Sequence, residues 1–265
     1  MALLGLIVTG CSSSHAAAGS HHAGTTTPTA AQVSASGSST TSGAGFPALV
    51  VAAMAEFNPV AAGAQAPHTL PQVSGYLTAE TSGLGGQDNV TLIATATPVP
   101  VDSPSLSSSS AGREVASFST TPTASAANAQ SQMAQARGQA IASCGGPSHP
   151  VTLSGGVAAT TCPTLDGAAI DWSDGAWAVQ VLTLDGTTPS TAEADTLAAR
   201  LAGDGLPTSD GGGIVTAVVP GNPSAGSSDT AALEWAKGAD VYQVRSSDDP
   251  TSALAVAAAM RPYPG

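Results

Sequence analysis

The chain of 265 residues carries 18 acidic against 6 basic side chains, a formal net charge of −12, and only 3% of its residues are aromatic. A chain this acidic offers no basic surface to a phosphate backbone, so nucleic acid is excluded as a partner. Hydrophobic residues make up 42%, which is enough for a core built mainly from Ala, Val and Leu.

The first residues have the character of an export signal. Residues 2–10 are apolar but too short to span a bilayer, which needs about 20 residues, and they match the apolar region of a secretory signal. The end of this run, Val8-Thr9-Gly10-Cys11, resembles the bacterial lipobox. That resemblance implies cleavage before Cys11, attachment of a diacylglyceryl group to its thiol and usually an N-acyl chain such as palmitate. Two or more acyl chains anchor a protein stably. The alternative is a chance apolar start with a free thiol.

The expected domain organisation follows from composition. Residues 1–10 are the signal peptide, and 11–44 are a lipid-anchored tether of Ser, Thr, Ala and Gly, too poor in apolar bulk to offset the entropy of ordering. Residues 45–265 are expected to form a single α+β domain.

The first half of that domain contains weaker patterns. The expected elements, in chain order, are a helix within 46–57 after Pro47, an antiparallel pair of strands at 73–80 and 89–99, a strand at 114–119, a helix at 125–141, and short strands at 151–154 and 157–161. Pro98 and Pro100 place the second strand of the pair at a sheet edge.

Cys144 and Cys162 remain once Cys11 is assigned to the lipid. In an oxidising compartment such a pair predicts a disulfide, and closing this loop would stabilise by about 3 kcal/mol in the chain-entropy model. Metal ligation lacks a second Cys pair or a suitably spaced His, and for a catalytic Cys only His149 is close in sequence.

The clearest pattern is an eleven-residue stretch that occurs twice, at 171–181 and 234–244, with a constant offset of 63 (234 − 171). Five identities define it: Trp172, Gly175, Ala176, Gln180 and Val181 recur as Trp235, Gly238, Ala239, Gln243 and Val244. Alternating apolar runs around a Gly turn predict a β-hairpin in each copy. A helix follows each hairpin, one with a capping box from Ser190 to Glu193 and one with Asp249 as cap before Pro250.

The predicted fold is therefore α+β: a mostly antiparallel, curved sheet with two C-terminal helices packed on one face. The repeated hairpin and helix units lie at about 165–203 and 228–261, and a strand is expected at 213–219 between them.

No catalytic, cofactor or metal motif is found. The sole Lys, Lys237, is followed by Gly, and neither Gly-x-Ser-x-Gly nor His-Glu-x-x-His occurs. Three acidic pairs are expected at turns or helix N-termini, where a structural role explains them: Asp171 with Asp174, Glu193 with Asp195, and Asp248 with Asp249.

The aromatic set on the repeated unit has two interpretations. Trp172, Trp177, Trp235 and Tyr242 form either the hydrophobic core or the lining of a cavity for an apolar ligand, and we favour the core.

The lipobox and the two Trp-x-x-Gly hairpins resemble those of secreted, lipid-anchored actinobacterial proteins of an uncharacterised family. In architecture, residues 70–262 are similar to bacterial lipoprotein-carrier and envelope stress-sensor folds. The resemblance implies a monomeric, non-enzymatic lipoprotein on the extracytoplasmic face of the cell membrane, without a cofactor, that binds an envelope protein or a lipid. An extracellular, membrane-anchored hydrolase is the alternative.

Overall fold

The computed structural model describes residues 45–57, 59–84, 86–107, 112–141, 144–185, 188–220, 229–247 and 249–264. The expected signal peptide, the lipidation site at Cys11 and the tether lie outside these residues. Within the described part, no helix has the length and apolar character needed to cross a membrane.

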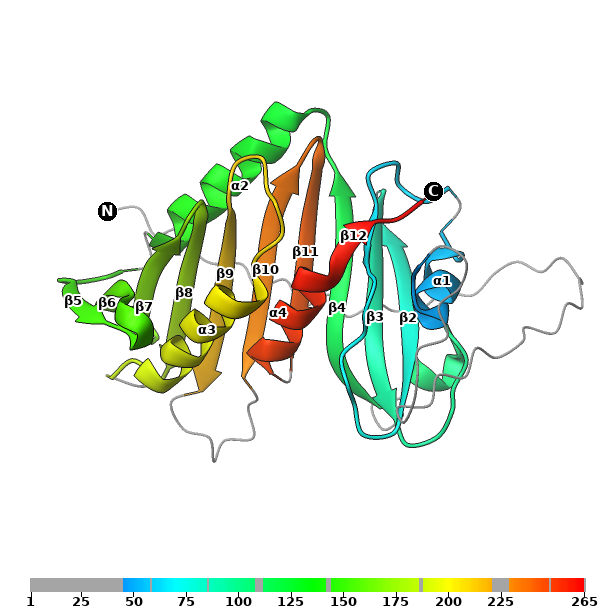
Figure 1. Cartoon of the computed structure of the whole chain (residues 1–265), viewed down its shortest axis with the longest axis horizontal. Coiled ribbons are helices and arrows are strands. Elements are labelled where there is room, and N and C mark those ends of the chain that lie inside the picture. The colour runs from blue at the N-terminus through cyan, green and yellow to red at the C-terminus, as the bar shows by residue number, and fades with distance from the viewer. Residues whose placement is uncertain are drawn as a thin grey trace, which may run out of the picture.

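One ten-stranded sheet dominates the structure, in the order β2-β3-β4-β11-β10-β9-β8-β7-β6-β5 (Figure 1). Its strands are β2 (Tyr76–Leu84), β3 (Gln87–Thr95), β4 (Arg113–Pro122), β5 (His149–Thr152), β6 (Ala158–Pro163), β7 (Gly167–Asp174), β8 (Trp177–Leu184), β9 (Gly213–Pro220), β10 (Thr230–Lys237) and β11 (Asp240–Ser246). Neighbouring strands are antiparallel except β8 and β9, which are parallel. The predicted α+β class and mostly antiparallel sheet are confirmed.

Helices and short elements complete the fold: α1 (Ala48–Met54), α2 (Ala126–Ile141), α3 (Thr191–Asp204), α4 (Pro250–Ala259), the 3-10 turns η1 (Pro104–Ser107) and η2 (Ser154–Gly156), and a small pair of β1 (Gln65–Pro67) with β12 (Met260–Pro262). The two C-terminal helices, α3 and α4, pack on the same face of the sheet, as predicted (Figure 1). Ser190 accepts the Glu193 N–H at the start of α3, and Asp249 accepts the Thr251 N–H at the start of α4.

The offset of 63 residues is visible in the sheet. Gly167 and Thr230 begin β7 and β10, and Trp177 and Asp240 begin β8 and β11, so the two hairpins correspond strand for strand. Beyond the hairpins the copies diverge. The chain returns from α3 into the sheet as β9 beside β8, whereas α4 leads to β12, which pairs with β1, and β4 occupies the free side of β11.

The centre of the core is an aromatic row that crosses four strands. Trp177 on β8 and Trp235 on β10 are both paired with Gly213 on β9, and their ring centroids lie 6.1 Å apart. Tyr242 on β11 stacks on Trp235 at 5.4 Å. A side chain at Gly213 would meet the Trp177 ring, because a Cβ there would lie 2.4 Å from a ring carbon. Glycine is therefore required where the two indoles meet.

The four candidate aromatic residues all lie in this core, under α3 and α4. Trp172 is 6% exposed, Trp177 5%, Trp235 0% and Tyr242 2%. The Tyr242 hydroxyl donates to the Gly63 carbonyl at 2.6 Å. Burial, with the nearby Asp240 carboxylate, raises the pKa of Tyr242 to about 12, so the phenol stays a neutral donor.

One feature of the sheet differs from expectation. The strand before Pro98 is not at an edge, because β3 ends at Thr95 and lies between β2 and β4. At this end of the sheet the edge strand is β2, where Thr81 donates its N–H to Asp102 at 2.6 Å and Asp102 donates its own N–H to the Ala79 carbonyl. These contacts satisfy backbone groups that an open edge would leave free for a second chain.

Truncating either Trp172 or Trp235 to Ala should lower the free energy of unfolding by about 3–5 kcal/mol, because each leaves a large cavity in a closed core. The measurement is the urea midpoint at unchanged slope. Leu165→Ala is the control, since that side chain is 98% exposed. A Trp235→Ala variant that unfolds with the parent would show that the row does not hold the fold.

Candidate functional site

The sheet has a second face, opposite α3 and α4, which we call the α2 face. Because side chains alternate along a strand, Trp235 on β10 points to the core and its neighbours Glu234 and Ala236 point to the α2 face. There Ala236 and Ile214 pack against Ala129 and Met133 of α2 in a small cluster separate from the main core.

Helix α2 is attached to this face by a narrow contact. Ala129 and Met133 are its buried side chains among the described residues, and Ala136 and Ala140 are half-buried. Arg137 adds a hydrogen bond of 3.3 Å to the Gly211 carbonyl. Burying one Met contributes roughly 1.5–3 kcal/mol, and the Ala side chains add less, so α2 depends on what holds its ends.

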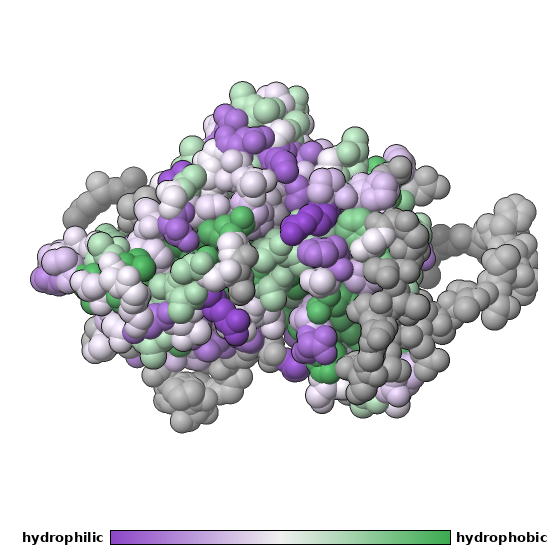
Figure 2. Space-filling view, viewed as in Figure 1, coloured by the Kyte–Doolittle hydropathy of each residue, from purple (hydrophilic) through white to green (hydrophobic). Residues whose placement is uncertain are grey.

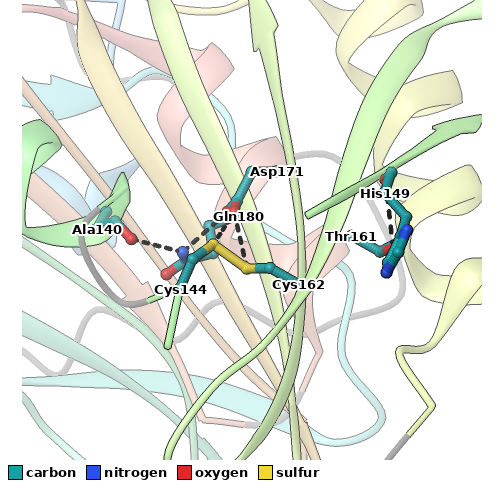
Figure 3. Close-up of a disulfide and its surroundings, with 7 residues drawn as sticks. All are labelled: Ala140, Cys144, His149, Thr161, Cys162, Asp171 and Gln180. Carbon is teal, nitrogen blue, oxygen red and sulfur yellow. Dashed lines mark hydrogen bonds between the residues drawn. A yellow bond between two sulfur atoms is a disulfide. The ribbon is translucent and has the colours of Figure 1, made fainter. Parts of the chain in front are cut away.

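The C-terminal end of α2 leads directly to the predicted disulfide, which is confirmed. Cys144 is joined to Cys162 on β6, with the two Cα atoms 5.5 Å apart. Beside it, the Gln180 amide donates to the Ala140 carbonyl of α2 and to Asp171 Oδ1, both at 2.8 Å (Figure 3). The disulfide and Gln180 together fix the end of α2 to β6 and β8.

Asp171 is the acidic side chain beside the disulfide. It lies within β7, directly opposite Gln180 on β8, and not at the turn where the sequence placed it, because the hairpin turn begins only after Asp174. Its Oδ2 lies 3.4 Å from Cys144 Sγ and 3.9 Å from Cys162 Sγ. Burial raises the pKa of the Asp171 carboxyl, and the Gln180 hydrogen bond partly offsets this.

The repeat supplies an internal comparison for Asp171 and Gln180. At the equivalent positions of the second hairpin, Gln243 donates to Glu234, also directly opposite across the two strands. Both pairs lie on the α2 face, and the sequence contained their signal: an acid followed nine residues later by Gln in each copy. The disulfide lies beside Asp171 and Gln180. The chain has one further cysteine, Cys11, so the second hairpin has no disulfide of its own.

Two shallow hollows lie on the α2 face. One, of about 390 Å³, adjoins the end of α2 and includes Thr160, Asp171, Ser173 and Gln180 in its lining. The other, of about 300 Å³, lies over β9 to β11 and includes Glu114, Thr216 and Arg245. Both are lined by a mixture of polar and apolar side chains.

A metal is the first alternative to test here. Cys144, Cys162 and Asp171 place one ligand atom each within 4.8 Å of one another, the one such group of three found in the described ranges. Cysteine ligates as a thiolate, and both sulfurs are bonded to each other. In its oxidised form the group does not fit a metal.

Two of the other acidic candidates have structural roles, and Asp174 is exposed at the end of β7. Asp195 accepts the Ser154 N–H at 2.6 Å, and Asp249 caps α4. Burial and the nearby Asp229 and Asp249 raise the pKa of Glu193 at the start of α3. Asp248 lies outside the described residues.

His149 and Lys237 are not part of the group around Asp171. The carbonyl of His149 accepts a hydrogen bond from Thr161 on the neighbouring strand β6 (Figure 3), and its side chain is exposed. Lys237 donates to Thr208 at 3.4 Å.

Comparison with known proteins gives no match: no protein-family model, no curated protein and no solved structure is similar to this chain. The function is therefore inferred from the geometry described above.

Gln180→Ala should lower the free energy of unfolding by about 1–3 kcal/mol, because it removes the two hydrogen bonds that Gln180 donates to the Ala140 carbonyl and to Asp171. Gln180 is 4% exposed, whereas its counterpart Gln243 is half-exposed, so Gln243→Ala should cost less. Equal losses in the two variants would contradict this.

The loss in Gln180→Ala should also depend on pH. Because the pKa of Asp171 is raised by folding, its ionisation costs stability as the pH rises above the value in the unfolded chain. Without Gln180 that cost is larger, so the difference between Gln180→Ala and the parent should shrink in acid. Denaturant titrations at pH 3 and pH 7 test this.

Proposed function

We propose that the protein is a non-enzymatic lipoprotein of the cell envelope, anchored through Cys11 on the extracytoplasmic face of the membrane, and that it binds a partner protein with its α2 face. The observation that carries the proposal is the contrast between the two faces of the sheet. One is sealed by α3 and α4, and the other is a broad, partly open surface.

The sealed face favours a protein partner over an apolar ligand. Trp177, Trp235 and Tyr242 contact one another, and with Trp172 they are packed in the main core beneath the helices. The surface over α3 and α4 alternates hydrophilic and hydrophobic residues over short distances (Figure 2). An apolar ligand would have to displace the core to reach the indoles.

The α2 face offers a row of side chains in register across six strands: Ser117, Arg245, Ala232, Thr216, Gln180 and Asp171. Thr216 and Ala232 are half-exposed and Arg245 is exposed. The hydroxyl, carboxylate and guanidinium groups of this row supply donors and acceptors for hydrogen bonds across an interface, of which a typical one carries about ten. Gln180 is 4% exposed and is held by Ala140 and Asp171, so the surface that we assign to the partner is the rest of the row.

The anchor is tested in the native host with a fatty-acid probe. The wild-type protein should be labelled and membrane-associated, and Cys11→Ala should be unlabelled and released into the medium, because one lipidated residue supplies the whole anchor. Equal labelling of the two would refute it.

The partner surface is tested by site-specific photo-crosslinking in the same host. A photoreactive residue at Thr216 should give a discrete crosslinked protein, because this position is half-exposed on the α2 face. The matched control is Thr196, exposed on α3, where no such product should form. The same products at both positions, or none at Thr216, would contradict the assignment. A hydrolase screen of the purified protein tests the alternative of an extracellular enzyme.

A further inference from the structure

We propose that the Cys144–Cys162 disulfide is a reducible clamp on α2: a dithiol opens it, Asp171 accepts a hydrogen bond from the Cys162 thiol that stays on β6, and the C-terminal end of α2 is released from the sheet. This goes beyond the proposed function and stands whether or not the α2 face binds a partner.

The two sulfurs differ in access. Cys162 is buried at 3% exposure on β6, whereas Cys144 is half-buried and is followed by the exposed Gly145 and Gly146. A thiolate of the reductant therefore reaches Cys144 Sγ, forms a mixed disulfide there, and Cys162 leaves as a thiolate that takes up the proton lost by the attacking thiol. The second thiol of the reductant then closes its own disulfide and releases Cys144 as a thiol. Two electrons and two protons pass from the dithiol to the protein.

Asp171 is placed to stabilise the product of this reaction. Its Oδ1 is held by Gln180, and its Oδ2 faces the two sulfurs at 3.4 and 3.9 Å. A disulfide sulfur has no hydrogen to donate, so in the oxidised form the two sulfurs give this carboxylate oxygen no hydrogen bond. Reduction turns Cys162, which stays on β6, into an S–H donor beside the carboxylate, and hydrogen bonds to charged groups are the stronger kind. The half-buried carboxylate is better satisfied in the reduced form.

Helix α2 is the element that responds. At its C-terminal end the disulfide is the covalent tie to β6, and the Gln180 bond to Ala140 is the polar contact. The other contacts are the small cluster around Ala129 and Met133, nearer its N-terminal end, with Ala136 and Ala140 packed beside it, and the Arg137 hydrogen bond to Gly211. Once the sulfurs separate, the last turns of α2 lose the tie that holds them over Gln180, while the first turns keep their packing.

The redox step is tested with the full chain carrying Cys11→Ala, equilibrated in mixtures of reduced and oxidised dithiothreitol, with the protein thiols counted by alkylation. The parent should be reduced under native conditions. Asp171→Asn should shift the equilibrium toward the disulfide by about tenfold, because a neutral amide is the weaker acceptor. Glu234→Gln, the same change at the equivalent position of the second hairpin, is the control and should shift nothing. Equal behaviour of Asp171→Asn and the parent overturns the role of Asp171.

The release of α2 is tested by hydrogen exchange on the reduced parent and on the double variant Cys144→Ser, Cys162→Ser. Amides in 134–141 should exchange at least tenfold faster than in the oxidised parent, while those of α3 and β8 keep their protection. Unchanged protection in 134–141 overturns the clamp. A loss of protection throughout the chain would also overturn the clamp, and so would reduction that proceeds only at the rate of global unfolding. In either case the disulfide would stabilise the whole fold and not α2 in particular.

Discussion

The contact between Trp177 and Trp235 across Gly213 is the constraint on which the structure depends. It joins the last strand of the first hairpin to the first strand of the second, with β9 between them. In a chain with 3% aromatic residues, these indoles and Tyr242 supply a large share of the bulky apolar surface at the centre of the core. Because these rings are committed to packing, α3 and α4 are fixed over one face of the sheet.

The parts of the fold that the sequence predicts are those set by local patterns. Alternating apolar residues around Gly175 and Gly238 place the hairpins, and the caps at Ser190 and Asp249 place the starts of the two helices over them. Which face of the sheet α2 covers could not be predicted from local sequence patterns. Its apolar strip of Ala129 and Met133 is too small to indicate which surface it covers, and the parallel pairing of β8 with β9 appears only once the path of α3 is known.

The candidate site follows the same division. The disulfide could be predicted from cysteine count and compartment, and the acid and Gln of the repeat were visible as letters. The contact between Asp171 and the two sulfurs could not be predicted from the sequence. It requires β6 to pair with β7 and α2 to end above Gln180. In both hairpins, residues nine apart in the sequence lie directly opposite each other. This spacing between the acid and the Gln is the sequence signal that would have placed Asp171 on a strand face and not in a turn.

The chain takes different paths after α3 and after α4, and this difference limits the addition of further repeats. In arrays of repeats, each unit offers its successor a free side on which to stack, and dedicated end units stop the growth. Here a third hairpin would have to pair with the side of β11 that β4 already occupies. The chain after α4 forms β12, which pairs with β1 in a separate two-stranded sheet. The N-terminal strands thus act as an end unit for a two-member array, so the duplicated module is closed to further extension on that side.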